Sequence, residues 1–101
     1  MQARQGDVLI ERVRALPANA KPQERNGRVV LADGEVTGHA HRVERADVAE
    51  LYDSDRGTFL TVRETTRAVH EEHGPVTLLP GVYRVTRQRE YAPDAIRNVA
   101  D

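Results

Sequence analysis

All four histidines of the chain fall in two short segments, His39-Ala40-His41 and His70-Glu71-Glu72-His73. In a β-strand, side chains at positions i and i+2 point to the same face, so His39 and His41 are predicted to present two imidazoles on one wall. The second pair follows about 30 residues later, a separation that a folded sheet closes easily. Imidazoles that meet from two facing segments are typical of a transition-metal site.

The absence of cysteine excludes disulfides and thiolate ligands, so any metal is predicted to be held by nitrogen and oxygen. The spacing favours zinc, iron, nickel or manganese without distinguishing among them. Three histidines with an open position would make a catalytic site, whereas a closed site would be structural. The alternative is a set of ordinary surface histidines. The candidate metal ligands are His39, His41, His70 and His73.

Carboxylates flank both histidine pairs and are candidates for ligands or for acid–base chemistry. Glu44 follows the first pair, and Glu71 and Glu72 lie inside the second. We predict Glu44 and Glu72 as the catalytic acid or base if the site is an enzyme's. His70 and His73 would point to opposite faces of a regular strand, so both can bind one ion only if the chain bends before Gly74-Pro75.

Arginine supplies fourteen of the fifteen basic residues, and several arginines lie on the last predicted strand. Arginines interleaved with tyrosines can hold phosphate and stack bases, but the net charge of −1 disfavours a nucleic-acid partner. A strand face solvated by arginine–glutamate pairs is the alternative. We predict Arg87 and Arg89 as anchors for a substrate carboxylate. A small-molecule ligand or a protein partner is therefore expected, and a homodimer is compatible with the sequence.

Short alternating apolar segments separated by turn residues predict an all-β fold with little helix, either a small β-barrel or a sandwich. The chain of 101 residues is expected to form one domain, 1–101, with a loose start over residues 1–5. A loop is predicted over 15–26 and a short C-terminal tail over 92–101. The segment 45–52 fits a helix or a strand. The strands are expected at 8–13, 28–32, 35–44, 58–64, 68–70, 76–79 and 82–91.

The composition also bears on location. No apolar stretch is long enough to span a membrane, and no charged and apolar leader opens the chain. Together with the lack of cysteine, these observations predict a cytoplasmic protein.

The spacing Gly34-x4-His39-x-His41-x2-Glu44 resembles the first motif of the cupins, and Pro80-Gly81-Val82-Tyr83 is similar to the turn and strand of their second motif. The resemblance covers residues 34–83. It implies a cupin-like small β-barrel in which His39 and His41 bind a metal and Glu44 is a third ligand. The chain departs from the cupin pattern in that His70 and His73 precede the Pro80-Gly81 turn.

These features predict a small β-protein that binds a divalent transition metal, either as a metal-binding protein or as a metal-dependent enzyme acting on a small polar molecule. The alternative is a non-catalytic interaction or regulatory domain in which the metal is structural or absent. A nucleic-acid-binding module that uses the strand 83–91 is a further, less favoured alternative.

Overall fold

The computed structural model describes residues 1–24, 27–33 and 39–88. Within them the chain is built from β-strands and one short 3-10 helix, η1 (Ala46–Val48), which confirms the predicted all-β class. The strands are β1 (Gln2–Gln5), β2 (Val8–Val13), β3 (Lys21–Pro22), β4 (Val30–Asp33), β5 (Ala40–Val43), β6 (Ala49–Ser54), β7 (Gly57–Val62), β8 (Thr66–Val69), β9 (Val76–Leu78) and β10 (Gly81–Arg87).

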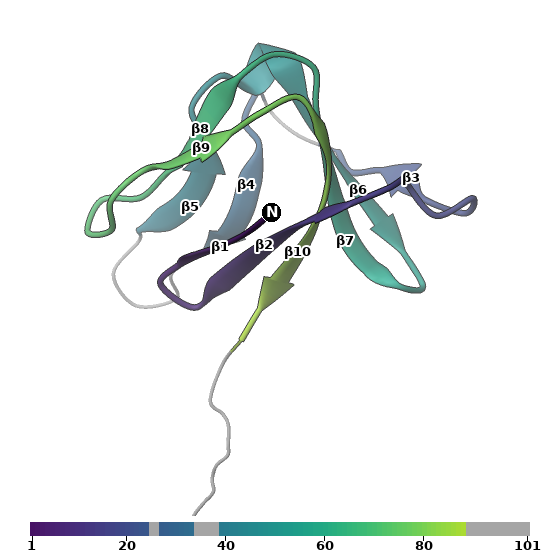
Figure 1. Ribbon diagram of the computed structural model, residues 1–101, viewed down its shortest axis with the longest axis horizontal. Helices are drawn as coiled ribbons and strands as arrows, with labels where there is room; N and C mark the ends of the chain where they lie inside the picture. Colours follow the sequence, from purple (N-terminus) through teal and green to yellow (C-terminus); the bar gives the residue numbers. More distant parts are fainter. Residues whose placement is uncertain (25–26, 34–38, 89–101) are drawn as a thin grey trace, which may run out of the picture.

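The strands form two antiparallel sheets (Figure 1). A six-stranded sheet has the order β1-β2-β10-β7-β6-β3, and a four-stranded sheet has the order β4-β5-β8-β9. Both sheets are open, so the architecture is a sandwich and not the closed barrel that the sequence also allowed. Contacts between β1 and β9 bring one edge of each sheet together. This edge is where the histidines lie.

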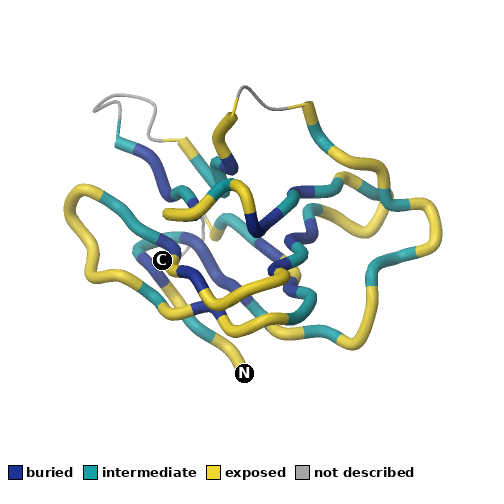
Figure 2. Tube along the Cα trace, turned by 90° about the horizontal axis from the view of Figure 1, so that it is seen from above, coloured by how far each residue is buried: buried dark blue, intermediate teal, exposed yellow. Residues whose placement is uncertain are grey.

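The hydrophobic core lies between the sheets and draws on both of them. In β10, Tyr83 and Val85 are buried while Arg84 between them is exposed, as the two-residue period of a strand requires. Ile10 of β2 and Leu78 of β9 are fully buried and belong to the same cluster of packed side chains. Figure 2 shows the buried segments passing through the middle of the molecule. The core therefore fixes the two sheets against each other.

Several sequence predictions need correction. The loose start over residues 1–5 is wrong, because Gln2–Gln5 pairs with β2 in a regular antiparallel register. The predicted loop 15–26 contains a two-residue strand, β3, which pairs with β6. The ambiguous segment 45–52 is a strand from Ala49 onward, β6, and the short 3-10 helix η1 precedes it.

Some predictions fall on residues 34–38 and 89–101, which lie outside the described part of the chain. These include Gly34 of the cupin-like motif, the end of the last strand, Arg89 and the tail 92–101. Among the described residues, no helix is long and apolar enough to cross a membrane.

Candidate metal centre

The structure brings all four imidazoles into one group, which we call the histidine cluster (His39, His41, His70 and His73). The His70 ring lies at the centre, and its centroid is 4.2 Å from that of His41 and 4.7 Å from that of His73. The His39 ring meets His70 edge-on at 5.7 Å. The two segments that contain the histidines therefore converge, although they are far apart in sequence.

The local backbone explains this convergence. His41 lies in β5, and His39 directly precedes that strand, so both side chains leave the same region of the sheet. Strand β8 pairs with β5 and ends at Val69, after which the chain bends through residues 71–73 before Gly74-Pro75. This is the bend that two histidines at i and i+3 need in order to reach one point.

Gln5 determines the orientation of His41. The Gln5 side-chain amide donates hydrogen bonds to the carbonyl oxygens of Ala68, at 3.0 Å, and Gly74, at 2.9 Å. Because both donations use Nε2, the amide oxygen faces His41 Nδ1, at 2.9 Å, and accepts its hydrogen. Neutral His41 therefore holds its proton on Nδ1 and keeps a free lone pair on Nε2. This is the arrangement that orients imidazole ligands in metal sites.

The turn between β1 and β2 lies against the same rings. Gly6 has a left-handed φ of 58°. A Cβ atom at this position would lie 2.7 Å from His73 Nε2 and 3.2 Å from His41 Cε1. Only glycine combines this φ with so close an approach of the backbone to the cluster. The turn therefore belongs to the wall of the site.

Asp7 extends the polar network beyond the imidazoles. One of its oxygens, Oδ1, lies 3.5 Å from His41 Nε2, and Oδ2 accepts a hydrogen bond from Arg87 Nε at 3.0 Å. Burial raises the pKa of Asp7, but the hydrogen bond and charge of Arg87 outweigh this effect and the pKa falls below its usual range. Asp7 is therefore held as a carboxylate, and Arg87, predicted as a substrate anchor, is bound to it.

The electrostatic surroundings keep His41 neutral. Only 4% of this residue is exposed. Burial lowers the pKa of His41 below its ordinary value, and the neighbouring His70 and His73 lower it further, while the Asp7 carboxylate opposes the shift. A neutral imidazole is the form that binds metal ions.

The second group of donor atoms lies on the more exposed side of the cluster. His39, His70 and Glu71 each offer a ligand atom within 4.8 Å of the others. The Ala40 amide donates to Glu71 Oε1 at 3.1 Å. Hydrogen bonds from its own backbone amide and from that of Ala40 lower the pKa of Glu71, which keeps this carboxyl ionised.

Glu72 and His70 interact within the bend. The Glu72 amide donates to His70 Nδ1 at 3.0 Å, so neutral His70 carries its proton on Nε2. The Glu72 carboxylate reaches the first histidine pair, with Oε1 at 3.7 Å from His39 Nδ1. Glu72 therefore adjoins the cluster, as its prediction as an acid or base requires.

Glu44 does not have the position that the cupin-like motif implied. Both of its carboxylate oxygens are bound by the Arg67 guanidinium, at 2.9 Å and 2.6 Å. This hydrogen-bonded pair lowers the pKa of Glu44. We therefore remove Glu44 from the candidate site, and the cupin resemblance stays a prediction.

Comparison with known proteins relates the chain to a protein family. No curated protein and no solved structure matches this chain. A family model does match residues 4–88, a range that includes β2 to β10, the turn at Gly6 and the whole histidine cluster. The chain therefore belongs to the family described as a domain of unknown function, DUF8820.

Proposed function

We propose that this protein binds one divalent transition-metal ion at the histidine cluster. The observation that carries the proposal is the spacing of the rings. If nitrogen lies about 2.0–2.1 Å from a tetrahedral ion, two imidazoles that share the ion have centroids about 5 Å apart. The neighbouring rings here are separated by 4.2 to 5.8 Å, which brackets this value.

His39, His70 and Glu71 form the first ligand set, because their donor atoms are already close together. His41 adds a lone pair on Nε2 that Gln5 keeps free of a proton. Coordination through His70 Nε2 requires this ring to move its proton to Nδ1 and to give up the Glu72 amide contact. Metal binding is therefore expected to alter the bend at residues 70–73.

A mixed nitrogen and oxygen donor set suits zinc, iron, nickel or manganese. A bound ion would acidify a coordinated water and polarise a substrate oxygen. Glu72, with a largely exposed side chain 3.7 Å from His39, is the acid or base that the site offers for a small polar substrate. In the catalytic form of the proposal, Glu72 transfers a proton to or from the substrate in addition to the binding of the metal.

The first test is the metal content of the full chain purified without a histidine tag. Inductively coupled plasma mass spectrometry should find about one equivalent of a transition metal, or zinc titration should reload one equivalent after chelation. The His39→Ala, His41→Ala double variant should lose this binding while its circular dichroism stays that of a β-protein. Full metal occupancy in the double variant would reject the proposal.

The second test separates the two glutamates. Glu71→Gln removes a charged donor from the proposed ligand set and should weaken zinc binding by about tenfold or more. Glu44→Gln is the matched control, because Glu44 is bound to Arg67 at the protein surface. Equal affinities of the two variants would show that Glu71 is not a ligand.

A second candidate function follows from the tautomers. His41 holds a lone pair on Nε2 and His70 holds a proton on Nε2, and the two rings lie 4.2 Å apart. Such a pair provides a base and an acid for metal-independent proton transfer. If the protein binds no metal at neutral pH, proton transfer explains the cluster better than metal binding does.

A further inference from the structure

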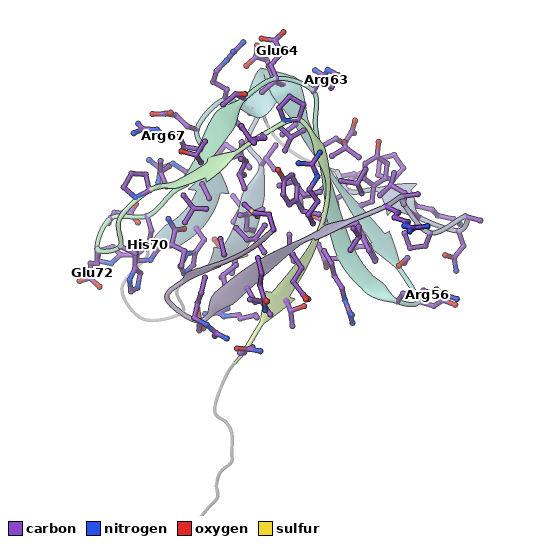
Figure 3. All side chains as sticks on the ribbon, viewed as in Figure 1. Arg56, Arg63, Glu64, Arg67, His70 and Glu72 are labelled. Carbon is purple, nitrogen blue, oxygen red and sulfur yellow. The ribbon has the colours of Figure 1, made fainter. Side chains whose placement is uncertain are left out.

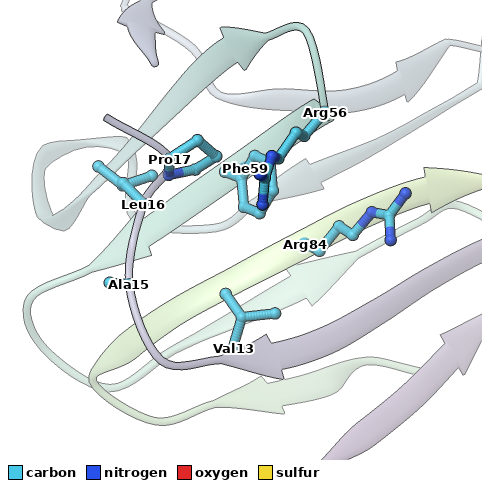
Figure 4. A pocket seen from close by; sticks show the side chains of 7 residues that line it. All are labelled: Val13, Ala15, Leu16, Pro17, Arg56, Phe59 and Arg84. Atoms are coloured by element: carbon cyan, nitrogen blue, oxygen red, sulfur yellow. The ribbon is translucent and has the colours of Figure 1, made fainter. Parts of the chain in front are cut away.

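A cavity lies on the outer face of the six-stranded sheet, away from the histidine cluster. In β10 the side chain of Arg84 points to the face opposite the buried Tyr83 and Val85. On that face the chain that follows β2 and the β6–β7 hairpin border a cavity of about 520 Å³ that is open to solvent (Figure 4). The lining residues are Val13, Ala15, Leu16, Pro17, Arg56, Phe59 and Arg84. In Figure 3, His70 and Arg56 lie at opposite sides of the molecule.

The floor of the cavity is apolar. Phe59 faces outward from β7 and its ring lines the cavity, with 6% of the residue's surface exposed. Leu16 and Pro17 lie next to this ring in the segment after β2, and Val13 closes the other side. The volume falls within the usual range for small-molecule sites, and the apolar lining is the part of such a site that holds the body of a ligand.

Two guanidinium groups border this floor. Arg84 lies directly opposite Phe59 in the β10–β7 register. Its Nε lies 4.0 Å from the point where a Cβ on Gly57 would be, so the side chain extends toward the hairpin that carries Arg56. The two cationic residues therefore approach the cavity from the β6–β7 turn and from β10, and they line it together.

The charges of these two arginines are not balanced by carboxylates within the described part of the chain. Neither Arg56 nor Arg84 takes part in an ion pair there, even though Glu11 is the opposite neighbour of Arg84 in β2. The guanidinium groups of Arg42, Arg45, Arg67 and Arg87, in contrast, are each paired with a carboxylate. Two unpaired cations beside an apolar floor are complementary to a ligand that is anionic at one end and apolar at the other.

We propose that this cavity binds a small organic anion. The apolar part, a ring or a short chain, packs against Leu16 and Pro17, and a carboxylate or phosphate head group accepts hydrogen bonds from Arg56 and Arg84. Guanidinium groups suit both kinds of oxyanion, because their N–H groups match the spacing of the oxygens. The site does not depend on metal binding, since the histidine cluster contributes nothing to its lining.

The test uses ¹H–¹⁵N NMR titrations of the full chain with four probes. Phenyl phosphate and benzoate carry both a ring and an anion, inorganic phosphate carries only the anion, and benzyl alcohol carries only the ring. At least one of the first two should bind about tenfold more tightly than the last two, with shifts concentrated at Val13, Leu16, Phe59 and Arg84. The tighter of the two identifies a carboxylate or a phosphate as the preferred head group.

Variants then locate the binding. Arg56→Gln and Arg84→Gln should each weaken the preferred probe by about fivefold or more, while Arg28→Gln, at an exposed position outside the cavity, should leave its affinity unchanged. Leu16→Asp, which places a carboxylate beside the floor, should abolish binding. Shifts spread over the other arginines, equal binding of inorganic phosphate, or unchanged affinity in both cavity variants would overturn the proposal.

Discussion

Gln5 connects three segments of the candidate site through one buried side chain. Replacement by leucine would leave the carbonyls of Ala68 and Gly74 and the Nδ1 hydrogen of His41 without partners. Two of these groups, the Ala68 carbonyl and His41 Nδ1, are buried. A buried group without a partner costs about 1–3 kcal/mol, so we expect Gln5→Leu to lower the free energy of unfolding by about 2–6 kcal/mol. Zinc affinity should fall by about 10- to 100-fold, as for other residues that orient a ligand.

Urea unfolding and zinc titration measure the two effects. Gln2→Leu is the matched control, because Gln2 lies in the same strand but is exposed, and it should change neither quantity. A Gln5→Leu variant that loses stability but binds zinc as tightly as the natural chain would contradict the role of Gln5 in orienting His41.

The neutral state of His41 predicts a pH dependence. Because burial and the neighbouring imidazoles lower its pKa below the ordinary value of about 6.5, the unfolded chain takes up this proton at a higher pH than the folded chain. The unfolded state then binds more protons below pH 6.5, so stability should fall as the pH decreases from about 7 toward the lowered pKa. Urea unfolding between pH 5 and 8 with a chelator present checks this, and His41→Gln should give a flatter profile. Parallel profiles would show that His41 does not contribute.

At the scale of elements, the β1–β2 turn is the segment whose backbone contacts the cluster. Gly6→Ala should cost about 1–2 kcal/mol for the left-handed φ. It should also displace His73, because the new Cβ would lie 2.7 Å from its Nε2, and so weaken zinc binding.

Gly27→Ala is a close control for this prediction. Gly27 has a similar φ of 75°, but a Cβ there would meet no atom within 4 Å. This variant should lose stability, as measured by urea unfolding, and keep its zinc affinity. Equal zinc affinities of the two variants would show that the turn does not shape the site.

The elements that the sequence predicted best are short runs of strand-forming residues that begin after turn residues. The predicted strand 8–13 coincides with β2, which follows Gly6-Asp7, and 58–64 overlaps β7, which begins at Gly57. β1 was missed because Gln2–Gln5 has no apolar period of its own. It forms a strand through its pairing with β2, which is a property of the sheet and not of the segment.

The site shows the same division between local and long-range information. The histidine spacing identified the residues that converge, because the grouping of all four histidines into two pairs can be seen in the sequence alone. Gln5 and Asp7 were missed as site residues, since a buried glutamine and an ion-paired aspartate have no local signature, and Gly6-Asp7 indicates only a turn. Glu44 was predicted from its position after the first histidine pair and from a motif, but its proximity to Arg67 depends on the pairing of β5 with β8.

At the scale of the whole molecule, the cluster lies where the two sheets meet. His41 and His70 come from the four-stranded sheet and the bend that follows β8, whereas Gln5, Gly6 and Asp7 come from the six-stranded sheet. The hydrogen bonds of Gln5 to Ala68 and Gly74 join the sheets at this edge. An ion bound here would therefore hold together the parts of the fold that unfolding separates.

This position predicts a stability that depends on the metal. An ion at 100 times its dissociation constant stabilises the folded state by about 2.7 kcal/mol, which for a domain of this size corresponds to a rise in Tm of about 10–20 °C. Differential scanning calorimetry with zinc and then with excess chelator should show this rise and its reversal. The His39→Ala, His41→Ala variant should unfold at the same temperature under both conditions. A zinc-dependent rise of the same size in this variant would place the stabilising ion elsewhere, because the first histidine pair would then be unnecessary for it.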